Sequence, residues 1–303
     1  MSSAPVSVSV VMSESKPEEI AQVKTSLSDK TAVVTGSTRG IGRETALSLG
    51  RLGADVVVHG RDSERGKEVV DSVGALDNGA SAEFVRADFS EASEVKSFAE
   101  ELRKYGCVDI LVNNAGGYFR DAETVDWRGT QVSRTVAVNH LAPFVVVAEL
   151  SESIEGRVIN TASEAHRDAS LNVSKFESPE AGWSAYCRSK LANVLFTRSL
   201  DRRIEDLGVY SAHPGVVLGS GLWRAFPSVL RRGAKILSPL FDSPENAASN
   251  LVYLAAKEDV PDGYYFKNRK PSKPSREARS DENARQLWEW SRELTQKGTD
   301  NTS

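Results

Sequence analysis

A tyrosine and a lysine lie four residues apart in the segment YCRSK, a spacing that brings two side chains to one face of a helix. Tyr186 carries a phenol with an ordinary pKa of about 10, which makes it a poor base at neutral pH. The ammonium group of Lys190 stabilises the phenolate and lowers that pKa. Ser163 follows a β-branched segment, and its hydroxyl can donate to a developing alkoxide. Together these residues predict acid/base catalysis at a carbonyl or an alcohol.

Each of these residues taken alone also has a purely structural explanation. A Tyr and a Lys four residues apart often form an exposed surface pair, and a Ser after a strand often caps a helix. Asn139, Asn113 and Asn114 lie near predicted helix or strand ends, where such residues usually make only structural hydrogen bonds. The chemical interpretation therefore depends on the elements that bring these side chains together.

A glycine-rich turn, TGSTRGIG at residues 35–42, follows the first predicted strand and begins the first predicted helix. Gly36 allows a tight turn, Gly40 lets the backbone approach a pyrophosphate, and Gly42 lets the helix pack closely on the sheet. The free N–H groups and the dipole at the start of the helix favour a diphosphate. The spacing is G-x-x-x-G-x-G, and three glycines alone are also typical of an ordinary turn. Their place between a strand and a helix indicates nucleotide binding.

The residues after the second predicted strand favour NADP(H) over NAD(H). An NAD site usually offers a carboxylate to the ribose 2'-hydroxyl, whereas an NADP site offers arginine to the 2'-phosphate. Here Arg61 follows the strand, and Arg39 in the glycine turn can reach the same pocket, so that two guanidinium groups can clamp one phosphate. We interpret Asp62, which falls where a ribose-binding acid is expected, as a solvated turn residue.

The chain alternates short β-branched segments with longer amphipathic segments, which is typical of βαβ units. We expect one α/β domain at residues 29–266, a doubly wound Rossmann-type fold with a seven-stranded parallel sheet and helices on both faces. A mobile tail precedes it at residues 1–28. Residues 267–303 form a connector and a short helix whose Trp288 and Trp290 dock on the domain. The expected strands begin at Thr31, Asp55, Ala82, Asp109, Arg157, Val209 and Gly263, and the expected helices cover residues 40–52, 64–73, 91–105, 124–150, 182–206 and 243–257.

Composition and charge exclude several other classes of protein. The 303 residues include 38 basic and 42 acidic side chains, and this balance without a basic block argues against nucleic-acid binding. Two cysteines, and four histidines without ligand spacing, argue against a disulfide scaffold and a metal site. No run of about 18 uncharged apolar residues and no secretory or transit signal occurs, so we expect a cytoplasmic protein without a transmembrane segment.

Several motifs occur together in an order that resembles the short-chain dehydrogenase/reductase family, over roughly residues 28 to 295. Within that family they look most like the retinol dehydrogenase-like reductases. The resemblance implies an NADP(H)-dependent oxidoreductase that interconverts an apolar aldehyde or ketone and its alcohol. The motifs are TGSTRGIG at 35–42, ADFS at 87–90, NNAG at 113–116, VNHLAPF at 138–144, NTASEAH at 160–166, YCRSKLANVLFTR at 186–198 and HPGVV at 213–217.

The resemblance also implies a role for each site residue. Tyr186 would be the catalytic acid/base, Lys190 would lower its pKa and hold the nicotinamide ribose, and Ser163 would bind the carbonyl oxygen. Asn139 would anchor a water relay behind Lys190, and Asp88 would contact the adenine amino group. With the glycine turn and the arginines, the expected cofactor residues are Gly36, Ser37, Thr38, Arg39, Gly40, Ile41, Arg61, Asp88, Phe89, Asn113, Ala115, Gly116, Pro214, Gly215 and Val217.

Two departures from the family pattern bear on cofactor and substrate. The chain has Gly219 where the family usually has a Thr or Ser that contacts the nicotinamide carboxamide, and it lacks the apolar N-terminal anchor of membrane-bound retinoid enzymes, which argues against retinol as the substrate. Residues 218–240 carry apolar side chains at helical spacing and are expected to form a lid over an apolar carbonyl compound. Core packing or an oligomer contact would explain the same stripe. Arg231 and Arg232 allow a weak contact with an anionic membrane surface.

Two function hypotheses of different classes follow. The first is the NADP(H)-dependent reductase of aldehydes or ketones, in which a steroid, retinoid or polyketide carbonyl is also possible. The second is a non-catalytic NADP(H)-binding redox sensor or scaffold, although a pure sensor does not need an intact catalytic set. We also expect a homo-oligomer that pairs through the helices at 124–150 and 182–206, and structural roles for His166 and His213.

Overall fold

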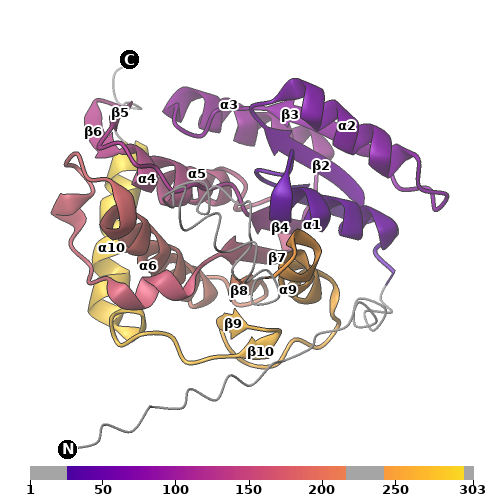
Figure 1. Ribbon diagram of the computed structural model, residues 1–303. Coiled ribbons are helices and arrows are strands. Elements are labelled where there is room, and N and C mark those ends of the chain that lie inside the picture. The colour runs from indigo at the N-terminus through magenta and orange to yellow at the C-terminus, as the bar shows by residue number, and fades with distance from the viewer. Residues whose placement is uncertain (1–25, 216–241, 297–303) are drawn as a thin grey trace, which may run out of the picture.

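The computed structural model describes residues 26–215 and 242–296, and Figure 1 shows a central sheet with helices on both of its faces. All neighbouring strands of this sheet are parallel except the last pair at one edge. The predicted α/β class and the doubly wound arrangement are confirmed. From one edge to the other the strands are β10 (Lys270–Pro271), β9 (Tyr265–Lys267), β8 (Gly208–His213), β7 (Ile154–Thr161), β4 (Val108–Asn113), β1 (Thr31–Val34), β2 (Asp55–Gly60) and β3 (Ala82–Arg86).

The sheet has eight strands, one more than the predicted seven. The additional strand, β10, pairs antiparallel with β9 across a turn in which Asn268 and Arg269 both have positive φ angles, 50° and 62°. Two-residue hairpin turns favour this backbone geometry because it matches the twist of the strands. The segment KNRKP has no apolar alternation, so nothing in its side-chain pattern indicates a strand.

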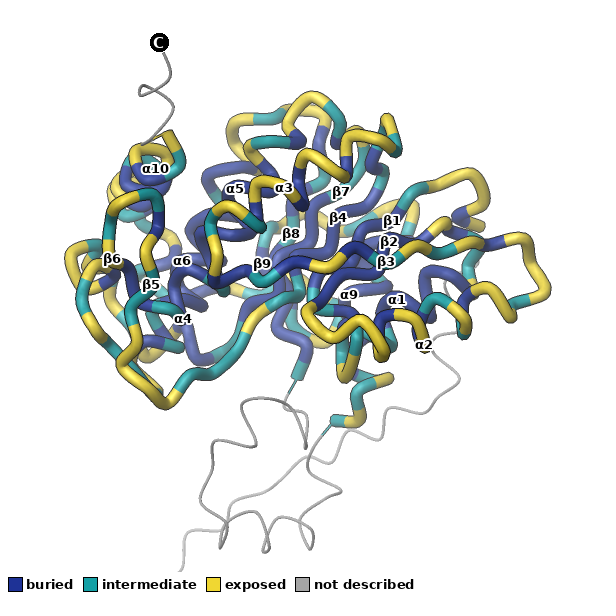
Figure 2. Tube along the Cα trace, turned by 90° about the horizontal axis from the view of Figure 1, so that it is seen from above, coloured by how far each residue is buried: buried dark blue, intermediate teal, exposed yellow. Residues whose placement is uncertain are grey.

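Each inner strand contributes side chains to two apolar layers, one on each face of the sheet. Val33 belongs to the core on one face, and its neighbour Val34 belongs to the core on the other, because successive side chains of a strand point to opposite faces. The central strands are buried between helices whose outer surfaces are exposed (Figure 2). The helices α1 (Gly40–Arg51), α2 (Ser63–Gly74) and α9 (Pro244–Ala256) cover one face, and α3 (Ala92–Leu102), α5 (Ala142–Glu149), α6 (Gly182–Asp201) and α10 (Asp281–Gln296) cover the other.

The prediction of one helix over residues 124–150 is wrong in its first part. The segment TVDWRGTQVS forms an antiparallel hairpin instead, because its residues alternate and Arg128 and Gly129 adopt the left-handed φ angles of a tight turn, 51° and 84°. Trp127 and Val132 of the hairpin are fully buried. The elements of this region are β5 (Thr124–Trp127), β6 (Thr130–Ser133), the short helix α4 (Arg134–Val136), a π-helical turn at Ala137–Leu141, and α5.

The helix α10 packs along α6 on the same face of the sheet (Figure 1). Trp288 contacts the rings of Phe144 and Phe196, with centroid distances of 5.1 and 6.2 Å. Trp290 stacks on the ring of His140 and donates its indole N–H to Glu177. The expected docking by these two tryptophans is therefore present.

Some expectations fall at or beyond the limits of the described residues. Leu27, placed in the expected tail, is buried, and its N–H donates to the carbonyl of Leu52 at 2.7 Å. Residues 1–25, Val217, Gly219 and the expected lid at residues 218–240 lie outside the described residues. Within residues 26–215 and 242–296, no helix has the length and apolar character that crossing a membrane requires.

Candidate active site

A cavity of about 990 Å³ lies at the carboxyl ends of the parallel strands. Its walls come from the segments that follow β1, β2, β3, β4, β7 and β8, which is where open α/β sheets bind their ligands. Most of the site residues predicted from the sequence line this one cavity. They are Gly36, Thr38, Arg39, Gly40, Ile41, Arg61, Asp88, Phe89, Ala115, Gly116, Ser163, Tyr186, Lys190, Pro214 and Gly215.

The glycine turn has the geometry of a diphosphate cradle. Gly36 has a φ angle of 65°, and a Cβ atom there would lie 2.7 Å from the Cα atom of Ala115. A Cβ atom on Gly42 would lie 2.3 Å from the carbonyl oxygen of Gly36, so neither position tolerates a side chain. Gly40, with a φ of 58°, has no atom within 4 Å of its Cβ direction and leaves the start of α1 open towards the cavity. This backbone fits a diphosphate at a helix N-terminus.

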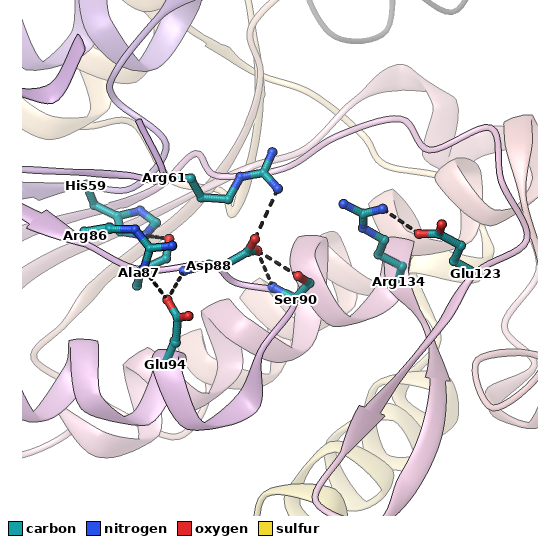
Figure 3. Close-up of polar contacts among 9 residues, drawn as sticks. All are labelled: His59, Arg61, Arg86, Ala87, Asp88, Ser90, Glu94, Glu123 and Arg134. Atoms are coloured by element: carbon teal, nitrogen blue, oxygen red, sulfur yellow. Dashed lines mark hydrogen bonds and ion pairs between the residues drawn. The ribbon is translucent and has the colours of Figure 1, made fainter. Parts of the chain in front are cut away.

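His59 ties the glycine turn to the segment after β3, a role that the sequence reasoning missed. Its Nδ1 atom accepts from the N–H of Gly36 at 3.1 Å. Its Nε2 atom lies 3.2 Å from the carbonyl of Ala87, a contact that Figure 3 shows. The imidazole also stacks on Phe89 with the centroids 4.1 Å apart. Burial lowers the pKa of His59 to about 3, so the ring stays neutral, accepts at Nδ1 and donates from Nε2. A polar side chain at the end of the apolar strand DVVVH was the available signal.

The two residues predicted to contact the adenosine end of a cofactor form an ion pair with each other. Arg61 lies 3.3 Å from the carboxylate of Asp88, whose other oxygen accepts from the N–H and the hydroxyl of Ser90 (Figure 3). Burial raises the pKa of Asp88, but the hydrogen bonds from Ser90 and the charge of Arg61 outweigh it and hold this pKa below its usual range. The carboxylate is therefore ionised and fixed in place.

Exposed guanidinium groups surround the mouth of the cavity after β2. Arg39 and Arg61 are both exposed and line the cavity, as does Arg65, which the sequence reasoning missed. Asp62 accepts from the N–H of Arg65 at 3.2 Å and thereby caps α2. Its carboxylate also pairs with the guanidinium of Arg65 at 3.4 Å, and these contacts agree with the interpretation of Asp62 as an exposed turn residue.

Tyr186, Lys190 and Ser163 lie together at the other end of the cavity. Tyr186 and Lys190 come from α6, and the Lys190 ammonium lies 5.7 Å from the centre of the Tyr186 ring. The same ammonium donates to the carbonyl of Thr161 at 2.8 Å. Burial raises the pKa of Tyr186 to about 12, and its hydrogen bond with Ser163 acts in the opposite direction. Burial lowers the pKa of Lys190 to about 8. The arrangement places a phenol, a hydroxyl and an ammonium around one point.

Asn139 is fully buried in the π-helical turn and holds the cavity wall from behind. Its Nδ2 atom donates to the carbonyl of Gly117 at 3.0 Å and to the hydroxyl of Ser189 at 2.9 Å, and its Oδ1 atom accepts from the N–H of Gly117. Ser189 in turn donates to the carbonyl of Tyr186. Asn139 therefore positions both the segment after β4 and the turn of α6 that carries Tyr186, while its role in a water relay stays a prediction.

Two other predicted cofactor residues also support the walls of the cavity. Asn113 is buried and donates its amide to Asn160 at 2.9 Å, across β4 and β7. Ser37 is fully buried, and its hydroxyl donates to the carbonyl of Val34 at 2.6 Å, which closes the glycine turn. Both side chains therefore make structural contacts within the protein.

The histidines near the site have different surroundings. His166 donates from Nδ1 to the carbonyl of Ser163 and accepts at Nε2 from the N–H of Ser275, so its role is structural, as expected. His213 lines the cavity, and burial lowers its pKa to about 4. In the part of the chain that the structure describes, no group of three His, Cys, Asp or Glu side chains is arranged to hold a metal ion.

A diphosphate cradle in one cavity with Tyr186, Lys190 and Ser163 defines the class of dinucleotide-dependent oxidoreductases. The model of the short chain dehydrogenase family matches residues 30–226. The protein belongs to this family, which confirms the resemblance seen in the sequence motifs.

Known relatives agree with this assignment. Dehydrogenase/reductase SDR family member 13 from Bos taurus is 35% identical over 286 residues, covering 89% of this chain and 74% of that protein. Retinol dehydrogenase 12 from Mus musculus is 34% identical over 277 residues, covering 88% of this chain and 86% of that protein. The crystal structure of the angucycline C-6 ketoreductase LanV with bound NADP is 30% identical, with a TM-score of 0.63, and covers 80% of this chain and 95% of that chain.

Proposed function

We propose that the protein is an NADP(H)-dependent oxidoreductase that interconverts an apolar aldehyde or ketone and its alcohol. The observation that carries the proposal is the single cavity, in which the glycine turn lies at one end and Tyr186, Lys190 and Ser163 lie at the other. A dinucleotide is long enough to place its diphosphate at the glycine turn and its nicotinamide beside Tyr186. The names of the relatives, a retinol dehydrogenase and a ketoreductase, support the same class of reaction.

The charges after β2 favour NADP(H) as the cofactor. Arg39, Arg61 and Arg65 line the mouth of the cavity where a ribose 2'-phosphate is expected, and guanidinium groups bind phosphate with paired N–H donors. The carboxylate of Asp88 is already engaged by Ser90 and Arg61. LanV, which resembles this chain in fold, has NADP bound. Arg61 would share its guanidinium between Asp88 and the phosphate.

The proposed reaction assigns one task to each catalytic side chain. When bound, NADPH supplies a hydride to the carbonyl carbon and leaves as NADP⁺. Ser163 donates a hydrogen bond to the carbonyl oxygen, and Tyr186 transfers its phenolic proton to that oxygen, so that the product is the alcohol. Lys190 stabilises the phenolate that remains, because its positive charge lies beside the ring. A proton from solvent restores the phenol.

The test compares Tyr186→Phe with the wild-type protein. Oxidation of NADPH, with NADH alongside, is measured against apolar aldehydes, ketones and retinal. We expect wild-type turnover with NADPH, and a loss of roughly 10²–10⁴-fold in the variant, the usual contribution of a general acid. The matched control is Tyr253→Phe, which removes a phenolic hydroxyl from α9, outside this cavity, and should retain turnover.

Two outcomes would contradict the proposal. Full turnover of Tyr186→Phe would remove its chemical basis. Tight NADPH binding without turnover of any carbonyl by the wild-type protein would instead support the second hypothesis, a non-catalytic redox sensor or scaffold.

A further inference from the structure

Trp183 is exposed beside the reactive phenol. Its side chain is 46% exposed, and no other large apolar residue within residues 26–215 and 242–296 is exposed to a comparable degree. It lies in the first turn of α6, three residues before Tyr186, and the centroids of the two rings are 5.9 Å apart with an interplanar angle of 31°. Exposure of an indole to water is unfavourable, which makes this position a candidate contact for an apolar ligand.

Two further aromatic residues, Tyr118 and Phe119, line the cavity itself, whereas Trp183 reaches it through its ring contact with Tyr186. The ring of Tyr118 also lies 5.9 Å from that of Tyr186, on the segment that follows β4. We call Tyr118, Phe119 and Trp183 the aromatic rim. Its members come from two segments far apart in the sequence, and they meet where Tyr186 would transfer a proton.

The backbone holds the aromatic rim in place. The N–H of Gly182 donates to the carbonyl of Phe119 at 3.0 Å, which ties the start of α6 to the segment after β4. Gly182 has a φ angle of 68°, a conformation that glycine adopts without strain. The guanidinium of Arg134 lies 4.7 Å from the centre of the Phe119 ring and is itself paired with Glu123 (Figure 3). The aromatic rings therefore form a preorganised surface, and little order has to be gained when a ligand binds.

We propose that the aromatic rim selects planar conjugated ketones as substrates of this site. The proposal rests on the function proposed above and narrows its substrate class. A flat π-system covers Trp183 by offset stacking while its carbonyl reaches Ser163 and Tyr186, and such stacking adds to the free energy of area burial alone. A saturated ketone of similar size has no flat face, so its binding gains only the free energy of burying apolar area.

The kinetic test uses two ketones that differ in flatness, acetylnaphthalene and its saturated counterpart acetyldecalin, with NADPH as the reductant. We expect Trp183→Leu, which keeps apolar bulk without a ring, to change substrate preference. The ratio of kcat/KM for acetylnaphthalene to kcat/KM for acetyldecalin should fall about tenfold. Trp183→Phe keeps a ring and should restore most of the ratio. Trp288→Phe changes an aromatic residue of α10 outside the cavity and should leave the ratio as in the wild type.

A binding measurement separates this inference from the proposed function. Naphthol is planar and cannot be oxidised at a saturated carbon, so its calorimetric Kd for the protein in the presence of NADPH does not depend on turnover. We expect Trp183→Leu to raise this Kd about tenfold and Trp183→Phe to raise it far less. An unchanged ratio and an unchanged Kd in Trp183→Leu, or equal losses for both ketones, would overturn the role of the rim. Absence of turnover with both ketones in the wild type, together with the expected change in Kd, would contradict the reductase and leave the rim intact.

Discussion

The imidazole of His59 makes one hydrogen bond to the glycine turn and one to the segment before Asp88. We expect His59→Leu to raise the KM for NADPH about five- to tenfold with little change in kcat, because the N–H of Gly36 and the carbonyl of Ala87 each lose a partner. His59→Gln carries an acceptor and a donor and should recover part of the loss. A fall in kcat at constant KM would show that His59 does not act through cofactor binding.

The arginine after β2 allows a test of cofactor choice. We expect Arg61→Ala to raise the KM for NADPH roughly tenfold or more and to leave the KM for NADH nearly unchanged, since only NADPH presents a 2'-phosphate. Arg86→Ala is the matched control, because Arg86 pairs with Glu94 and does not line the cavity. Equal changes for both cofactors in Arg61→Ala would contradict the assignment of the phosphate site.

The ammonium of Lys190 determines the expected pH dependence of reduction. Burial lowers its pKa to about 8, so its positive charge is present below that pH and is lost as the pH rises through it. We therefore expect kcat/KM for ketone reduction to fall above about pH 8. In Lys190→Arg the guanidinium keeps its charge, so the remaining activity should not fall there. An alkaline decline of the same midpoint in that variant would assign the titration to another group.

Among the elements, seven strands of the central sheet were predictable, since each is a short run of β-branched or aromatic residues bounded by turns. The glycine turn and the YCRSK segment were predictable for the same local reason: their residues are close in sequence. His59 and Tyr118 were not, because their importance arises from contacts between segments that only the folded sheet and helices bring together. Local patterns contain no information about such pairs.

The β5–β6 hairpin shows how a turn overrides an expected helix. Gly129 has a φ angle of 84° and donates its N–H to Asp126, so we expect Gly129→Ala to destabilise the protein by about 1–2 kcal/mol through backbone strain. Urea unfolding measures this change. The control is Gly74→Ala in α2, where a Cβ atom meets nothing within 4 Å and the helix gains propensity, so its stability should be equal or higher. Similar stability of both variants would argue against strain at Gly129.

For the molecule as a whole, the four histidines make folding sensitive to acid. Burial lowers the pKa of His59 and His140 to about 3, lowers that of His213 to about 4, and also lowers that of His166. The unfolded chain takes up protons below its ordinary histidine pKa of about 6.5, while the folded protein does not. This contribution to stability is complete above that pH and is lost as the pH falls towards the folded values.

We therefore expect the free energy of unfolding, measured in urea, to decrease as the pH falls from about 6.5 to 4. Its slope against pH should correspond to the uptake of up to four protons when the chain unfolds. His140→Gln should reduce this slope by one proton, because glutamine at this position takes up no proton in the unfolded chain. A slope that is the same in the variant and the wild type would exclude His140 as a contributor.

The packing of α10 bears on assembly as well. The expected homo-oligomer, paired through the helices at 124–150 and 182–206, stays a prediction. Since α10 lies along α6, a pair of subunits that uses this side of α6 must include α10 in its interface. Light scattering measures the molar mass in solution of the wild type and of Arg292→Glu, which reverses a charge on α10. A lower mass in the variant would support an interface that includes α10, and equal masses would place any interface elsewhere.

The same docking has a consequence for how the protein is made. During translation α6, which carries Tyr186 and Lys190, leaves the ribosome well before α10. Until α10 arrives, the rings of Phe144 and Phe196 lack the cover that Trp288 supplies. The nascent chain therefore presents an uncovered aromatic surface on α5 and α6, and a chaperone that binds such surfaces would engage it during this interval.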